Sequence, residues 1–135
     1  MPEQRAVLLA WDPKGEPLLV ETPDEAEAQL RDLHAQLSVA GSPTLVVLER
    51  EGEDTSLAVG LGAESAMASW LGDDPAEDLT SRGDGDDEDL VAFLYAGAES
   101  EYPGTVSIDV EDAFAAAHEY ASTGQRPTNL AWQSI

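Results

Sequence analysis

Acidic side chains are the groups in this chain best placed to do chemistry. Nine Asp and Glu residues lie between Asp73 and Asp89, and the densest run is Asp84-Gly85-Asp86-Asp87-Glu88-Asp89. A calcium-binding EF-hand loop needs Gly at its sixth position and a bidentate Glu at its twelfth. Counted from Asp84, those positions hold Asp89 and Tyr95. The motif therefore fails, and we expect weak, nonspecific cation binding with no dedicated metal site and no cofactor.

The sequence gives little support for a catalytic site. His34 and His118 each fall within a predicted helix, far along the chain from any obvious nucleophile. With 28 Asp and Glu residues, close carboxylate pairs arise by abundance alone, so they do not identify an acid–base pair. No G-x-S-x-G elbow, phosphate-binding glycine loop followed by Lys, or H-E-x-x-H pattern occurs. The sequence predicts no catalytic residue and a protein that is not an enzyme.

The net charge is the strongest compositional signal. The 28 acidic residues face six basic ones, which gives a formal charge of −22 on 135 residues. Such an excess opposes folding through self-repulsion, and it argues against direct binding to nucleic acid or anionic membranes, which requires Lys and Arg. It favours a basic partner, which an anionic surface attracts over long distances. The alternative to a basic partner is that the protein is simply soluble and acidic.

Length and composition predict one domain over residues 1–135 in the cytoplasm. Hydrophobic residues make up 42% of the chain, enough for one core, and no cysteine is present to form disulfides or a zinc site. No apolar run approaches the roughly 20 residues needed to cross a bilayer. The first residues lack the basic and apolar segments of a signal peptide.

Hydrophobic periodicity and turn residues predict the elements that must position these acids. Two helices are expected, one from Pro23 to Val39 capped by Thr22 and one from Val110 to Ala121 capped by Asp109. Short strands are expected at Arg5–Trp11, Pro17–Glu21, Thr44–Arg50, Ser56–Leu61, Met67–Leu71, Leu90–Tyr95 and Leu130–Trp132. The apolar run Leu90–Tyr95 is interpreted as a central strand, 72–89 as a flexible acidic loop and 97–104 as a connection. The fold class is α+β, a mainly antiparallel sheet of about six or seven strands with two helices on one face.

The C-terminal third carries a recognisable pattern. Glu101-Tyr102-Pro103 precedes the second predicted helix, which is followed by Thr123-Gly124-Gln125-Arg126-Pro127 and then Trp132. This order resembles the signature of the Imm1 immunity proteins. The Gly60-Leu61-Gly62 strand, the Trp70 region and the Ser81-x-Gly83-Asp84 segment are similar too, so the resemblance covers most of the chain. The chain departs from the family mainly in the length and acidity of 72–89.

The resemblance implies a cytoplasmic antitoxin of a bacterial polymorphic toxin system. Imm1 proteins are typically encoded beside toxins of the nucleic-acid deaminase superfamily, so the implied partner is a basic, nucleic-acid-acting toxin domain. Binding would occlude the substrate cleft of that toxin. Two other interpretations stay open: an accessory or adaptor protein of Imm1-like fold in a biosynthetic or regulatory cluster, and an acidic cation-binding protein.

Candidate partner-binding residues are acids on predicted loops and two aromatic residues that flank such loops. They are Trp70, Asp73, Asp74, Asp84, Asp86, Asp87, Glu88, Asp89, Glu99, Glu101 and Tyr102. Aromatic residues beside acidic loops are candidates for binding hot spots.

The signature residues themselves are predicted to stabilise the scaffold. Gly124 is expected to adopt a positive φ, Pro127 to fix the exit of the chain, and Trp132 to pack in the core. Arg126 is expected to pair with a carboxylate or carbonyl group, and Glu101 is a candidate partner.

Overall fold

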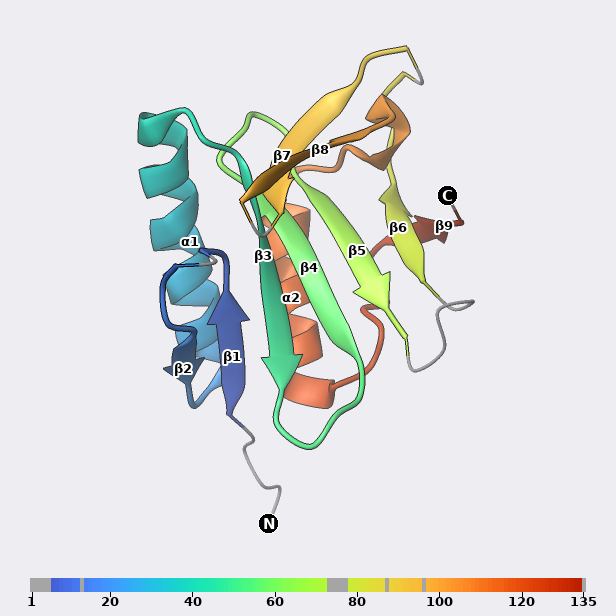
Figure 1. Ribbon diagram of the computed structural model, residues 1–135. Helices are drawn as coiled ribbons and strands as arrows, with labels where there is room; N and C mark the ends of the chain where they lie inside the picture. The colour runs from blue at the N-terminus through green and yellow to red at the C-terminus, as the bar shows by residue number, and fades with distance from the viewer. Residues whose placement is uncertain (1–5, 13, 73–77, 87, 96, 135) are drawn as a thin grey trace.

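The fold is a sheet covered by two helices on one face and by a β-hairpin on the other (Figure 1). The computed structural model describes residues 6–12, 14–72, 78–86, 88–95 and 97–134. In these ranges the strand order is β2-β1-β3-β4-β5-β6-β9, and the β7–β8 hairpin branches from β3. The elements are β1 (Val7–Ala10), β2 (Leu18–Val20), α1 (Pro23–Ala40), β3 (Thr44–Arg50), β4 (Ser56–Leu61), β5 (Met67–Leu71), β6 (Leu79–Arg82), β7 (Val91–Tyr95), β8 (Ala98–Tyr102), the 3₁₀ turn η2 (Gly104–Val106), α2 (Val110–Thr123) and β9 (Ala131–Gln133).

Helix α1 begins and ends at the residues that the sequence indicates. The Thr22 hydroxyl accepts a hydrogen bond from the Glu25 N–H at 3.1 Å, and Pro23 occupies the first helical position. The helix ends at Gly41, whose φ of 67° is the left-handed conformation that glycine adopts without strain. Between these ends Ala26, Leu30 and Leu33 are buried against the sheet.

Helix α2 is rich in alanine on its buried side, which lets it lie close to the sheet. Ala113, Ala116 and Ala117 are fully buried. Of the larger residues, Phe114 packs against His34 and Arg31 of α1, and Tyr120 packs against Trp70 of β5. Asp109 occupies the N-cap position, although its side chain makes no capping hydrogen bond. The helix runs to Thr123 and stops at Gly124 with φ 72°.

The sheet separates two hydrophobic clusters. Alternation along the strands sends residues such as Leu48 and Val59 toward the helices, whereas Leu45 and Met67 face the β7–β8 hairpin. Phe93 of β7 is the centre of this second cluster, and Gly60 makes room for it, because a Cβ at Gly60 would lie 2.7 Å from the Phe93 ring. The hairpin is therefore fixed to the sheet by an apolar contact.

Three sequence expectations about residues 72–104 are wrong. Leu90–Tyr95 is not a central strand, because β7 meets β3 only where Thr44 pairs with Leu94 and otherwise pairs with β8. The expected connection 97–104 contains β8, whose alternation of acids with Ser100 and Tyr102 suits a half-exposed strand. The expected loop 72–89 contains β6, which pairs with β5 and β9. The described sheet has nine strands, somewhat more than expected, and the α+β class with two helices is confirmed.

Candidate functional site

The acidic segment after β6 is packed against the chain that follows β8. The Gly83 N–H donates to the Thr105 carbonyl at 2.6 Å. A Cβ on Gly83 or Gly85 would collide with the backbone of Ser107 or Gly104. Gly104 in turn lies so close to the Asp86 and Asp89 carbonyl groups that it tolerates no side chain. Glycines thus hold this run of carboxylates at the base of the β7–β8 hairpin.

The hairpin adds two more carboxylates to the same region. Glu99 and Glu101 are exposed and pair in register with Leu94 and Ala92 of β7. Phe93 packs on the sheet, and because side chains alternate along a strand, these four residues point to the outer side of the hairpin. We call the exposed acids of this region the acidic end; they are Asp84, Asp86, Glu88, Asp89, Glu99 and Glu101.

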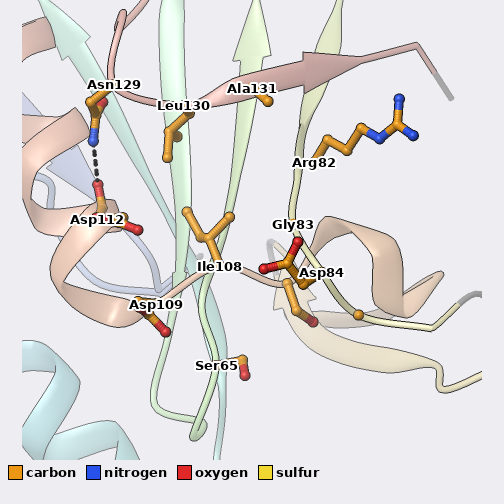
Figure 2. Close-up of a pocket in the computed structure, with 12 residues that line it drawn as sticks. Ser65, Arg82, Gly83, Asp84, Ile108, Asp109, Asp112, Asn129, Leu130 and Ala131 are labelled. Carbon is orange, nitrogen blue, oxygen red and sulfur yellow. Dashed lines mark hydrogen bonds between the residues drawn. The ribbon is translucent and has the colours of Figure 1, made fainter.

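A polar cleft of about 400 Å³ opens beside the acidic end (Figure 2). Asp84, from the segment after β6, faces Ile108 across it, and Asp109 and Asp112 come from the first turn of α2. The Asn129 side chain closes one side by donating to the Asp112 carbonyl at 3.1 Å. Among the described residues, three carboxylates from two segments far apart in sequence therefore line one hollow together with a single cation, Arg82, and this excess of negative charge suits a cationic side chain of a partner.

Sequence reasoning identified only Asp84 among the acids of this cleft. Asp109 was interpreted as a helix cap, and Asp112 was not singled out. The pairing of Ala66 with Ile108, together with the close packing of Gly83 on Ser107, brings them to the same cleft as Asp84. Within the described ranges no group of three His, Asp or Glu side chains is arranged to hold a metal ion.

The two aromatic residues that are predicted to contact a partner, Trp70 and Tyr102, are less exposed than expected. Trp70 is only 7% exposed and packs edge-on against Tyr120, with the ring centroids 5.8 Å apart. Tyr102 is partly buried against the Phe93 cluster, and this burial raises its pKa. The exposed apolar side chains of this region are instead Leu90, at 62%, and Tyr95, at 42%. They lie at opposite ends of β7 and were not predicted.

The signature residues near the C-terminus act largely as the sequence suggests. Gly124 has the expected positive φ, and its N–H donates to the Tyr120 carbonyl at 2.7 Å. The Trp132 indole N–H donates to the Pro127 carbonyl at 3.0 Å, which fixes the turn into β9. Trp132 packs at the border of the main cluster and is partly buried.

Arg126 does not pair with Glu101. It is exposed, and within the described ranges it forms no ion pair, while Glu101 lies on the hairpin. Two other guanidinium groups in the described part of the chain stabilise the scaffold. Arg31 of α1 donates to both Glu111 carboxylate oxygens at 2.9 and 2.8 Å, and Arg50 donates to the Ala121 and Ser122 carbonyls at 3.1 and 3.4 Å and pairs with Glu53 at 3.0 Å. A cation at the C-terminus of α2 also complements the helix dipole.

Both histidines have structural partners. The His34 ring nitrogen Nδ1 accepts the Gly62 N–H at 2.9 Å, and the ring packs edge-on against Phe114. His118 Nε2 lies 2.9 Å from an Asp24 carboxylate oxygen, which joins α2 to α1. These contacts fix α1 to the end of β4 and α2 to α1.

Three predicted contact residues, Asp73, Asp74 and Asp87, lie outside the described residues. In the described part of the chain, neither helix has the length and apolar character needed to cross a membrane.

Comparison with known protein families places these features in context. Residues 14–134 match the family described as Immunity protein Imm1. The match contains both helices, the β7–β8 hairpin and the acidic end, and it leaves out residues 1–13, which include β1, and residue 135. No curated protein matches the chain. Because the family match extends over nearly the whole sequence, this chain belongs to the Imm1 family of immunity proteins.

Proposed function

We propose that the protein neutralises a toxin of the nucleic-acid deaminase type by covering its substrate cleft with the acidic end. The observation that carries this proposal is the gathering of six exposed carboxylates on the hairpin and on the glycine-anchored segment beside it. The protein would act by binding alone, without catalysing a reaction, from the cytoplasm of the cell that it protects.

The proposal follows from what a deaminase must do. Such an enzyme holds a polyanionic strand and brings one base to a metal-activated water. The cleft that receives the strand must therefore attract phosphate groups, which requires basic side chains. An acidic surface that docks in this cleft competes with the substrate through the same charges.

A stable complex would use the acidic end together with the surface that adjoins it. Specific interfaces commonly bury about 1,600 Å² in total, or roughly 800 Å² on each partner. The hairpin, the segment after β6 and the cleft of Figure 2 adjoin one another, since Asp84 belongs to both the segment and the cleft. Leu90 and Tyr95 supply exposed apolar surface next to these charges.

Co-expression with the toxin domain encoded beside this chain tests the proposal. We expect the protein to restore growth of cells that produce the toxin and to co-purify with it. In a purified assay it should stop deamination of a single-stranded oligonucleotide, and excess oligonucleotide should slow formation of the complex. Absence of both growth rescue and complex formation would refute the proposal.

A complex that leaves deamination unaffected would favour the adaptor interpretation instead.

A further inference from the structure

Among the described residues, strand β8 has an open edge, and it is longer than either end strand of the main sheet. In the described ranges β8 pairs only with β7, whereas β2 and β9 form the two ends of the main sheet. The latter strands have three residues each, and Pro17 precedes β2, while β8 has five residues and contains no proline. Short strands, prolines and charged side chains are the usual protections of sheet edges. Of these three, β8 has only charged side chains, Glu99 and Glu101, which leave its backbone groups open to a strand of opposite charge.

The hydrogen-bond pattern identifies the backbone groups that the open edge presents. The Leu94 N–H donates to the Pro43 carbonyl at 2.8 Å, so the Leu94 backbone faces β3 and not β8. In an antiparallel pair, residues alternate between facing the partner strand and facing away from it. Glu99 pairs in register with Leu94 and Glu101 with Ala92. The backbone N–H and C=O groups of Glu99 and Glu101 therefore point away from β7, to the open edge.

The side chains on this edge favour a partner strand of positive charge. Glu99 and Glu101 are both exposed, and the acidic segment adjoins the base of the hairpin. A second copy of this chain would place like charges opposite one another, which opposes pairing. A strand with Lys or Arg at alternate positions would instead pair opposite charges across the new ladder.

We propose that β8 accepts an added strand from the toxin, a basic one whose Lys or Arg side chains lie opposite Glu99 and Glu101. Main-chain hydrogen bonds would supply affinity, and the two carboxylates would set register and exclude acidic strands. The exposed side chains of Leu90 and Tyr95, at either end of β7, would contact residues that flank the added strand. This inference rests on the proposed function and names the mode of binding.

The experiment measures amide exchange of the full chain by NMR, alone and bound to the toxin domain encoded beside it. We expect the Glu99 and Glu101 amides to exchange rapidly in the free protein and to become protected in the complex. The Ser100 amide, which faces β7, should be protected in both states. Cross-strand contacts from β8 to toxin backbone protons should appear as well.

A pair of variants separates the backbone contribution from the charge. Glu101→Thr removes the carboxylate and keeps the N–H, whereas Glu101→Pro removes both and leaves the ladder to β7 intact. One lost hydrogen bond is worth about 1 kcal/mol, so Glu101→Pro should bind roughly fivefold more weakly than Glu101→Thr. Urea unfolding of both variants verifies that they are folded. If Glu101→Pro does not fold, the amide-exchange measurement on the wild-type chain still tests the added strand.

A complex in which the Glu99 and Glu101 amides stay unprotected would overturn the added strand and leave the proposed function standing. Equal affinity of folded Glu101→Pro and Glu101→Thr would overturn it too. Failure to form any complex would overturn both proposals.

Discussion

At the scale of single residues, Arg50 and Tyr120 join α2 to the β3–β4 turn. The fully buried Tyr120 hydroxyl donates to the Thr55 carbonyl at 2.8 Å and accepts the Arg50 N–H at 3.2 Å. Arg50 extends the same network to the last carbonyl groups of α2. The network fixes one end of the helix that carries Asp109 and Asp112 at its other end.

Replacing Tyr120 with Phe tests this network. The substitution keeps the ring that packs on Trp70 and removes the hydroxyl, so the partly buried Arg50 N–H and Thr55 carbonyl lose their partner. We expect the free energy of unfolding to fall by about 1–3 kcal/mol in urea denaturation. Tyr95→Phe is the matched control, because Tyr95 is exposed, and its effect should stay within roughly 0.5 kcal/mol. Equal effects of the two substitutions would show that the network is not stabilising.

The same hydroxyl predicts how stability changes at high pH. Burial raises the pKa of Tyr120 above its ordinary value of 10.0. The resulting stabilisation is complete below the pKa of the unfolded chain and is lost as pH rises through the raised pKa. The stability of the protein should therefore decline above about pH 10.

Burial also raises the pKa of Tyr102, so the informative quantity is the difference between wild type and Tyr120→Phe. The decline measured by urea unfolding should be shallower in the variant. Parallel curves would contradict the assignment to Tyr120.

At the scale of elements, Gly104 joins the hairpin to the acidic segment. Because its Cα lies against the Asp86 and Asp89 carbonyl groups, Gly104→Ala must push the segment away from the hairpin. We expect this variant to bind the toxin domain roughly tenfold or more weakly, about 1.4 kcal/mol, in calorimetric titration.

Gly41→Ala provides the matched control for this substitution. Gly41 has a positive φ and no atom within 4 Å of the added Cβ, so its replacement costs about 1 kcal/mol of stability without moving the acids. Toxin affinity should remain unchanged in this control. Unchanged affinity in Gly104→Ala would instead show that the position of the segment does not matter.

Elements with strong local signals could be predicted from the sequence, and those that depend on distant contacts could not. Thr22, Pro23 and Gly41 define α1 within the chain itself, and the prediction of that helix is confirmed to within a residue. The run Leu90–Tyr95 carries no information about its neighbours, so the single contact of β7 with β3 could not be foreseen.

The site was predictable in the same uneven way. The acids of 84–89 and of β8 stand out by composition. Asp109 and Asp112 instead reach the cleft through contacts between segments far apart in the sequence, namely the pairing of Ile108 with Ala66 and the packing of Gly83 on Ser107. The low exposure of Trp70 could not be predicted, because a single tryptophan near a loop does not reveal which face of its strand is covered.

At the scale of the whole molecule, charge opposes folding and promotes association. A net charge of −22 on 135 residues produces self-repulsion that dissolved salt screens. The Debye length falls from about 30 Å at 0.01 M to about 8 Å at 0.15 M. Thermal unfolding of the free protein should therefore shift to higher temperature over this range. A fall in the unfolding temperature would contradict this account.

The central claim is that the position of the carboxylates matters, and not their number alone. Two variants with the same net charge separate these possibilities. One neutralises acids of the acidic end: Asp86→Asn, Glu88→Gln, Glu99→Gln and Glu101→Gln. The other neutralises exposed acids elsewhere: Glu16→Gln, Glu21→Gln, Asp32→Asn and Glu51→Gln.

The most direct test is the affinity of these two variants for the toxin domain, measured at physiological salt. If the acidic end enters the basic cleft, the first variant should bind at least about tenfold more weakly than wild type, and the second should lose less than about threefold. Equal affinities of the two variants would contradict the account, because binding would then depend on total charge or on another face of the molecule.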